Sequence, residues 1–431
     1  MFLYESFSLK TFACNSYMRK ALKNKFQTFV KRDYAMKKKI ILIEGVYDTI
    51  DLFTENIKEA LEEMGCECLV LDAGHMEESL KAFAFFAMTP VTAAITFNNL
   101  GYNLELPEGK NIWEQFHIPY VNILMDHPFH YTKALSHMPE TAWVFCTDQN
   151  HVAFLNRFYP QIKRVGFLPH AGVELPGEKK KISERKIQVL YAGSLPFFTA
   201  GMLVPDLSAV TQFDAIDMSR QVLEDLIKNP SLPTEQAIEA YLRERDIILD
   251  KQELFDGIVK MRFLDSYATS FFREQAVRLL VESGIDVTAY GTGWNACEWS
   301  ENPHLHYGGK VLAPEILPLM CDAKIVLNTM TWYKAGAHDR IFNGMLAGAC
   351  VVTDDSAYLR QQFENEQKLV RFRLEEIGHL PELIWKLLDH PDEMQQIADA
   401  GYQAAREGHT WKSRMQEIFS VLEGQNADFD L

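Results

Sequence analysis

The stretch 324–354 constrains the fold more than any other part of the chain. It opens with an apolar run typical of a buried parallel strand, and a second such run follows at 349–353. Between the two runs lies a polar loop, after which apolar residues recur at helical spacing from Asp339 until Gly348. Glycine commonly ends a helix. The order strand, loop, helix, strand therefore predicts one βαβ unit of a doubly wound parallel sheet.

Polar side chains follow both strands of this unit. Ligands of doubly wound sheets bind at the carboxyl ends of strands and at helix N-termini. We therefore expect a binding site on this edge of the sheet, formed by Asn328, Asp339, Arg340, Thr353 and Asp354. An ordinary βαβ unit with polar surface loops is the alternative interpretation, because polar loops occur on any protein surface.

The alternation of apolar strands and amphipathic helices repeats along the chain. The expected strands before residue 174 are 39–44, 68–71, 92–97, 120–124, 142–146 and 164–167. A charged stretch at 174–185 predicts a linker, and a new strand follows at 187–191. The pattern predicts an α/β chain with two Rossmann-like domains, at 36–173 and 186–405. No G-x-G-x-x-G follows the first strand, which argues against a tightly bound dinucleotide there.

Two segments of the second half are predicted to be helical. Residues 197–262 are rich in helix formers and predict two or three helices inserted into the second domain. The next helix is expected at 266–283, with Phe271 among its buried side chains. An apolar stripe within 406–431 predicts a C-terminal helix.

Composition excludes several classes of protein. The chain has 431 residues, 47% of them hydrophobic, and a net charge of −16. A nucleic-acid binder would normally present a basic surface, so this net charge argues against nucleic-acid binding. The seven cysteines form no C-x-x-C pair, and several lie in apolar runs, which favours free thiols in a reducing compartment. No apolar run has the length of a membrane span, so we expect a cytoplasmic protein.

The first 35 residues have a different composition from the rest. They contain two acidic residues and seven basic ones, namely Lys10, Arg19, Lys20, Lys23, Lys25, Lys31 and Arg32. One interpretation is a basic amphipathic arm with peripheral contact at the inner face of the membrane. The other is a disordered upstream extension, which the missing helical stripe favours.

Several short motifs carry a family resemblance. They are Arg340-Ile341-Phe342-Asn343, Leu346-Ala347-Gly348, Val351-Val352-Thr353-Asp354, Tyr290-Gly291-Thr292-Gly293-Trp294 and Asp126-His127-Pro128. The chain resembles the CgeB-like, spore-maturation-protein-like branch of the bacterial GT-B glycosyltransferases. The family has a glutamate where this chain has Asn343, and the resemblance implies that this position grips the ribose of a nucleotide. Asparagine can still hydrogen-bond hydroxyl groups but carries no charge.

The resemblance implies two Rossmann-like domains that face a cleft. The first would hold the acceptor and the second the donor, with the helix of 406–431 packing back towards the first. It also implies a hexosyltransferase-like reaction that needs no metal. The co-substrate would be a UDP- or GDP-sugar, no separate cofactor is expected, and the acceptor would be a hydroxyl of a glycan, surface polysaccharide or protein.

Residue roles follow from these expectations. We expect Arg340, helped by Arg273, to bind phosphate. The full donor-binding set is Gly193, Arg273, Gly291, Gly293, Trp294, Asn328, Asp339, Arg340, Asn343 and Thr353. Asp126 or His127 is the candidate base for the acceptor hydroxyl, and Tyr47, Asn98 and His130 are the candidate acceptor-binding residues. No spacing of His, Cys, Asp and Glu predicts a metal site.

Two other functions remain open on the sequence. The replacement of the family glutamate by Asn343 fits a binding or scaffold protein that kept the fold and lost catalysis. A nucleotide-sugar epimerase on the same architecture is the second, and it would need no acceptor. The oligomeric state, the sugar and the stereochemical outcome are not predicted.

Overall fold

The computed structural model describes residues 37–46, 48–106, 108–195, 205–208, 210–364 and 367–424. The basic segment 1–35 and Tyr47 thus lie outside the described residues. The chain divides into two compact units. Unit 1 consists of the described parts of Met1–Cys146, His151–Leu168 and Met415–Leu431, and unit 2 of Thr147–Asn150 and the described parts of Pro169–Arg414.

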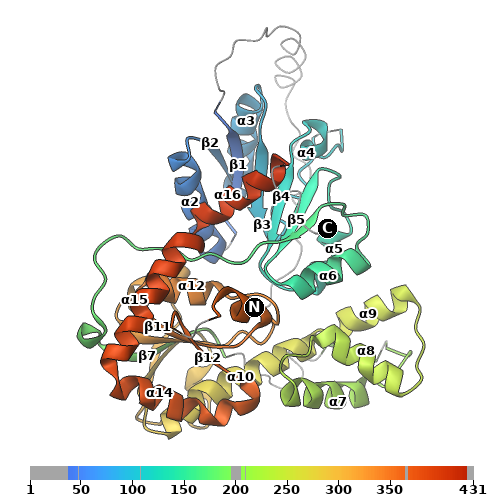
Figure 1. The fold of residues 1–431 in the computed structure, drawn as a ribbon. Helices are drawn as coiled ribbons and strands as arrows, with labels where there is room; N and C mark the ends of the chain where they lie inside the picture. Colours follow the sequence, from blue (N-terminus) through green and yellow to red (C-terminus); the bar gives the residue numbers. More distant parts are fainter. Residues whose placement is uncertain are drawn as a thin grey trace. The chain divides into compact units, whose positions relative to one another are not determined.

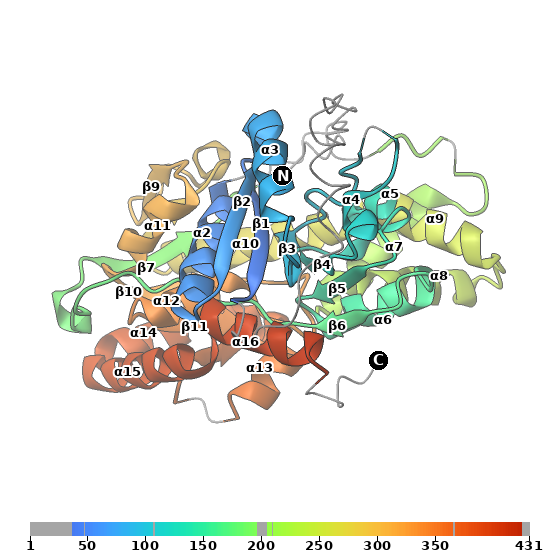
Figure 2. The ribbon, with the colours of Figure 1, turned by 90° about the horizontal axis from the view of Figure 1, so that it is seen from above.

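Unit 1 is built on a six-stranded parallel sheet. Its strands are β1 (Lys39–Glu44), β2 (Glu67–Asp72), β3 (Ala93–Phe97), β4 (Tyr120–Leu124), β5 (Ala142–Cys146) and β6 (Val165–Phe167). Figure 2 shows them side by side in the order β2-β1-β3-β4-β5-β6. Every residue of β3 and β4 is buried, as expected for central strands covered on both faces.

Helices connect these strands. They are α2 (Asp48–Glu63), η1 (Ala73–His75), α3 (Met76–Phe86), α4 (Ile112–Gln115), η2 (Pro128–His130), α5 (Thr132–Leu135) and α6 (Gln149–Phe158). The last turns of α16 (Trp411–Leu422) also belong to unit 1, where Lys38 pairs with Glu423 and lies 4.3 Å above the ring of Phe419.

Unit 2 holds a second six-stranded parallel sheet. Its strands are β7 (Ile187–Ala192), β8 (Val287–Tyr290), β9 (Leu305–Gly309), β10 (Ala323–Asn328), β11 (Cys350–Asp354) and β12 (Val370–Phe372). Their order is β12-β11-β10-β7-β8-β9, so the chain reverses its direction of travel between the neighbours β7 and β10. The predicted α/β fold with two Rossmann-like sheets is confirmed.

The helices of unit 2 include the predicted insertion. Among the described residues between β7 and α10 (Phe263–Glu282), three helices form, and Figure 1 shows them grouped beyond one end of α10. They are α7 (Ala215–Lys228), α8 (Thr234–Glu244) and α9 (Lys251–Met261). The prediction for Phe271 was wrong, because its side chain is 38% exposed while Phe272 faces the core.

The remaining helices of unit 2 flank the sheet or follow it in the chain. They are η3 (Ile182–Glu184), η4 (Trp294–Ala296), α11 (Ala313–Met320), α12 (Asp339–Leu346), α13 (Ala357–Gln362), η5 (Leu374–His379), α14 (Leu380–Asp389) and α15 (Pro391–Gly408). Helix α12 ends before Gly348, as predicted, and Gly348 N–H bonds back to Met345 O.

Arg185 anchors the charged stretch that is predicted to be a linker. Its guanidinium is buried and donates to four backbone carbonyls, those of Lys180, Met320, Ala323 and Ala347. These carbonyls come from the linker, from the residues around the start of β10 and from the end of α12. One side chain thus ties this stretch to β10 and α12 within unit 2.

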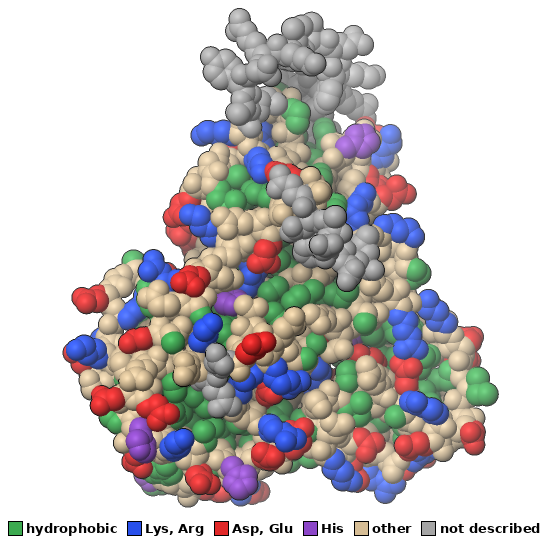
Figure 3. Space-filling view, viewed as in Figure 1, with side chains coloured by type: hydrophobic (Ala, Val, Ile, Leu, Met, Phe, Trp, Pro, Cys, Tyr) green, Lys and Arg blue, Asp and Glu red, His purple; other side chains and the backbone are tan. Residues whose placement is uncertain are grey.

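The surface carries mixed charge. On the face shown in Figure 3, acidic and basic side chains are interspersed over the described residues. No helix in the described part of the chain is long and apolar enough to cross a membrane.

Candidate functional site

Two glycine-containing loops meet at the carboxyl ends of β7 and β8. Gly193 N–H bonds to Tyr290 O at 2.8 Å, and Leu195 N–H bonds to Thr292 O at 2.7 Å. A Cβ atom at Gly293 would lie 1.7 Å from Leu195 O, and its φ is 100°. Glycine is therefore required there for the loops to touch. Gly291 and Gly293, both predicted to bind the donor, build the turn around Gly193.

Trp294 supports this turn from inside the core. Its side chain is fully buried and packs against the ring of Tyr191. Its indole Nε1–H donates to Gly193 O at 2.8 Å. The structure thus places Trp294 beneath the turn, where it fixes the direction in which the backbone of Gly193 points.

Arg340 joins the ends of β10 and β11 to this turn. Its guanidinium donates through Nη1 to Asn328 Oδ1, and Asn328 Nδ2 donates to Thr353 Oγ1 at 2.9 Å. Asn328, Thr353 and Arg340 are therefore brought together as the sequence predicts. Burial lowers the pKa of Arg340, and the nearby charge of Arg273 lowers it further. An anion at this place would relieve both effects.

Arg273 reaches the same turn from α10. Its Nη1 donates to Ser194 O at 2.7 Å, and its guanidinium carbon lies 5.2 Å from the ring of Trp332. Arg273 Nε and Trp332 Nε1 are both buried, and neither has an acceptor among the described residues. Buried donors without a partner are rare and mark a place where a ligand or water completes the site.

Asn343 is held by internal hydrogen bonds. Its Oδ1 accepts the Val173 N–H at 2.8 Å, and its Nδ2 donates to Asp339 Oδ2 at 2.9 Å. A glutamate at this position could not donate, and it would place a second carboxylate against Asp339. The structure therefore gives a reason for asparagine here that needs no ligand.

Asp339 stays ionised because histidine and arginine surround it. Burial by itself would raise the pKa of Asp339, but His338, His170 and Arg340 outweigh burial and hold the pKa well below its usual range. The Nδ1 atom of His338 lies 2.7 Å from Asp339 Oδ1 and 3.1 Å from Arg340 N. Nδ1 accepts the Arg340 N–H, so the His338 side chain caps the N-terminus of α12.

Two buried carboxylates hold the loop after β10. Asp354 accepts the Met330 N–H at 2.9 Å, and Asp148 accepts the Ala335 N–H at 2.6 Å. Burial raises the pKa of Asp354 to about 7. Between these two ends the loop presents Trp332 to Arg273. The position of this loop therefore decides where the indole donor points.

One family comparison matches part of the chain. Residues 269–420 match the sequence profile of the glycosyl transferase-like family. The matched segment contains Arg273, the glycine loop after β8, Asn328, Arg340 and Thr353. The glycosyl transferase-like segment thus covers most of the site, while Gly193 lies outside it. No curated protein matches the sequence. The CgeB-like assignment remains a prediction.

Solved structures similar to this chain share little sequence with it. A sucrose-phosphate synthase from Thermosynechococcus elongatus is 11% identical, with a TM-score of 0.47, over 90% of this chain and 100% of that one. A glycosyltransferase from Rickettsia africae is 8% identical, with a TM-score of 0.45, over 91% and 99%. HepE from Anabaena in complex with UDP is 10% identical, with a TM-score of 0.45, over 90% and 100%.

The candidate catalytic residues lie in unit 1, after β4. The Asp126 carboxylate accepts the Tyr131 hydroxyl at 2.9 Å. The His127 ring is buried and stacked on Phe129, and its Nδ1 accepts the Phe129 N–H at 3.2 Å. Burial, followed by the charge of His130, holds the pKa of His127 well below its usual range. His127 is therefore neutral near pH 7.

The predicted acceptor residues have different surroundings. Asn98 has a φ of 46°, and its Oδ1 accepts the Met125 N–H at 2.9 Å, which ties the ends of β3 and β4 together. His130 is half-buried, with its ring against Phe129. Tyr47 lies outside the described residues. The roles of these residues remain predictions.

Trp332 and His338 were not predicted as site residues, although they lie in the polar loop of 324–354 and their position there was a usable signal. Asp148 and His170 follow the expected strands 142–146 and 164–167, so the sequence places them at the carboxyl edge of the first sheet. The structure instead assigns both to unit 2, where Asp148 and His170 contact the polar loop at Ala335 and Tyr333. No group of three or more His, Cys, Asp or Glu that could hold a metal ion occurs among the described residues.

Proposed function

We propose that the protein is a glycosyltransferase that moves a sugar from a UDP- or GDP-sugar to a hydroxyl of a glycan or protein acceptor. The observation that carries the proposal is the pair of arginines at the Gly193–Ser194 turn. Arg340 and Arg273 approach the turn from different elements, and the match of 269–420 to the glycosyl transferase-like family covers both. The turn follows β7, where the order of strands reverses, which is the usual ligand position in such sheets.

The two arginines supply the charge that the reaction requires. When the bond between sugar and phosphate breaks, the nucleoside diphosphate leaves with added negative charge. Arg340 Nη2 and Arg273 Nε have no acceptor among the described residues, so both are available to phosphate oxygens. We therefore assign neutralisation of the leaving group to these side chains, without a bound metal.

The acceptor hydroxyl must lose its proton as the new bond forms. Asp126 is our first candidate for this base, because its carboxylate is half-buried and the Tyr131 hydroxyl orients it. His127 is the second candidate, but its ring is packed in the core and Nδ1 already accepts a backbone N–H. Turnover by Asp126→Asn and His127→Gln, each at saturating donor, distinguishes the two candidates.

A donor-binding test comes first. UDP and GDP are added separately to the full-length protein, and the melting temperature and calorimetric Kd are measured. We expect one of them to raise the melting temperature, because it binds the folded state alone. Arg340→Lys and Arg273→Lys should weaken binding by roughly tenfold or more, since lysine cannot reproduce the guanidinium geometry. Arg278→Lys, at an exposed position on the same helix as Arg273, is the control.

Two results would contradict the proposal. In the first, neither nucleotide shifts the melting temperature. In the second, both lysine variants bind as tightly as the wild type. A protein that binds a nucleotide but releases none from any UDP- or GDP-sugar would instead support the non-catalytic alternative. The internal hydrogen bonds of Asn343 favour that alternative, because they leave its side-chain oxygen committed to Val173.

A further inference from the structure

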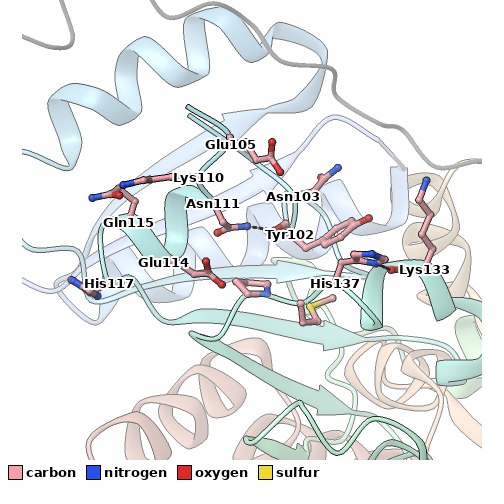
Figure 4. Close-up of a pocket in the computed structure, with 13 residues that line it drawn as sticks. Tyr102, Asn103, Glu105, Lys110, Asn111, Glu114, Gln115, His117, Lys133 and His137 are labelled. Carbon is pink, nitrogen blue, oxygen red and sulfur yellow. Dashed lines mark hydrogen bonds between the residues drawn. The ribbon is translucent and has the colours of Figure 1, made fainter. Parts of the chain in front are cut away.

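A separate hollow lies in unit 1, away from the predicted catalytic residues. It has a volume of about 730 Å³ and lies between the segment 102–117 and the residues around α5 (Figure 4). Its walls include His117, shortly before β4, and Pro139, shortly before β5. Asp126 and Asn98 instead follow the carboxyl ends of strands β4 and β3. The hollow is thus at the opposite edge of the same sheet.

The walls of the hollow are fixed by hydrogen bonds. Asn111 accepts the Trp113 N–H and donates to Tyr102 O at 2.7 Å, while Trp113 Nε1 donates to Gly101 O. Glu114 Oε1 accepts the Glu140 N–H at 2.8 Å, which joins the two sides. The hollow is therefore preformed, as small-molecule sites generally are.

Three further polar side chains of the hollow have no partner among the described residues. The side chains of Asn103, Glu105 and Gln115 form no hydrogen bond or ion pair there. Figure 4 shows Asn103 close to Tyr102 and Gln115 on the far side of the hollow, beside Lys110. Together they offer amide donors and both amide and carboxylate acceptors. A ligand with many hydroxyl groups can use both kinds, because each hydroxyl donates one hydrogen bond and accepts others.

The hollow also offers apolar surface. The half-buried ring of Tyr102 lies in the middle of the labelled residues in Figure 4, and Met138 and Pro139 add further apolar atoms. Burial raises the pKa of Tyr102, so its hydroxyl stays protonated at neutral pH. A pyranose ring has one face of C–H groups and a rim of hydroxyls, which matches an aromatic ring and amides in one hollow.

The charges in the hollow favour a neutral ligand. Lys110 and Lys133 contribute two positive charges, and Glu105 and Glu114 contribute two negative charges. Figure 4 shows the lysines on opposite sides of Tyr102. A site for a phosphate or a polyanion would require an excess of cations. The balance found here disfavours both anions and cations.

We propose that this hollow binds a neutral segment of a glycan, one or two sugar rings long. The role of the glycan rests on the proposed glycosyltransferase function. The bound segment would belong to the acceptor or the product, at a distance from the reacting hydroxyl. The volume is within the range of sites for small ligands, about 300–1,000 Å³. The main contacts would be stacking on Tyr102 and hydrogen bonds to Asn103 and Gln115.

The test is saturation-transfer NMR on the full-length protein. The probes are four neutral trisaccharides, namely maltotriose, cellotriose, mannotriose and chitotriose. At least one should receive saturation, and its Kd should rise by roughly tenfold or more in Tyr102→Ala. Asn103→Ala and Gln115→Ala change side chains without protein partners, so they test the site even if Tyr102→Ala fails to fold. Tyr307→Ala, on β9 of unit 2, is the control, because its side chain is 39% exposed.

Several results would overturn the proposal. They are the absence of binding by all four probes, equal binding by the wild type and the hollow variants, and Tyr102-dependent binding of a heparin disaccharide alone. UDP and GDP binding is measured on the same samples. If nucleotides fail to bind while a trisaccharide binds in a Tyr102-dependent way, the proposed function fails and the glycan site remains. If a nucleotide binds while no trisaccharide binds in a Tyr102-dependent way, the glycan site is rejected and the proposed function remains.

Discussion

The Nη2 atom of Arg340 lies 3.2 Å from the point that a Cβ atom at Gly193 would occupy. These residues are distant in sequence, and they meet because β7 and β10 are neighbours in the sheet. A Cβ atom at this distance would be closer to Nη2 than ordinary van der Waals contact allows. The observed position of the guanidinium therefore requires a residue without a side chain at 193.

Gly193→Ala should displace Arg340 and weaken nucleotide binding by roughly tenfold, with a small loss of stability. Calorimetry with UDP and GDP measures the effect. Gly378→Ala is the matched control, because a Cβ atom there would meet nothing within 4 Å. Unchanged affinity in Gly193→Ala would show that the guanidinium can move aside without cost, and would remove the turn from the proposed site.

The donor and the acceptor of the hydrogen bond between Asn343 and Asp339 should be interchangeable by mutation. Asn343→Asp places two carboxylates together and should lower the free energy of unfolding by about 2–4 kcal/mol. In the double variant Asp339→Asn with Asn343→Asp, one residue again donates and the other accepts, so most of the stability should return. Urea unfolding of the wild type, of Asn343→Asp, of Asp339→Asn and of the double variant gives the coupling energy. Additive losses would contradict the proposed donor and acceptor roles.

The buried carboxyl of Asp354 should make stability depend on pH. Its pKa is about 7 in the folded protein, against 3.8 for the unperturbed group, so the folded state retains a proton that the unfolded chain has lost. Stability from this group therefore falls as pH rises from about 4 to 7. Asp354→Asn keeps an acceptor for the Met330 N–H and does not titrate.

The stability of Asp354→Asn relative to wild type should thus be more favourable at pH 8 than at pH 5.5. The expected difference is on the order of 1–2 kcal/mol. Chemical unfolding at the two pH values measures it. A difference that is constant with pH, or of opposite sign, would mean that Asp354 is already ionised at pH 5.5.

Arg185→Leu should destabilise unit 2 by about 2–4 kcal/mol, because four backbone carbonyls lose their donor in the interior. Arg278→Leu is the control, since Arg278 pairs with Glu282 on the exposed side of α10, and we expect a change under about 0.5 kcal/mol there. Thermal unfolding compares the two. Equal effects would show that water replaces the Arg185 guanidinium at the carbonyls.

Much of the fold was predictable from local patterns. The strands β1, β4 and β5 begin and end where the apolar runs do, because buried parallel strands need continuous apolar side chains. The prediction for Phe271 was wrong because α10 has apolar side chains on more than one face, so spacing alone could not distinguish Phe271 from Phe272.

The candidate site was only partly predictable. Asn328, Arg340 and Thr353 were found because they lie within one βαβ unit, where neighbouring strand ends must meet. Trp332 was not found, because nothing local in the sequence shows which buried donor lacks a partner. Asp148 follows the expected strand 142–146 and was placed at the edge of the first sheet, but its hydrogen bond to the loop after β10 depends on which distant segments meet in the fold.

The sequence by itself determined the number of strands before the linker, the inserted helices and the polar edge of the βαβ unit at 324–354. These follow from the periodicity of apolar residues, which is a local property of the chain. Only the tertiary structure decided that β7 lies beside β10, which brings Gly193 to Arg340 and Arg273. Strand order depends on packing between distant segments, because every buried strand can satisfy its backbone hydrogen bonds beside any other.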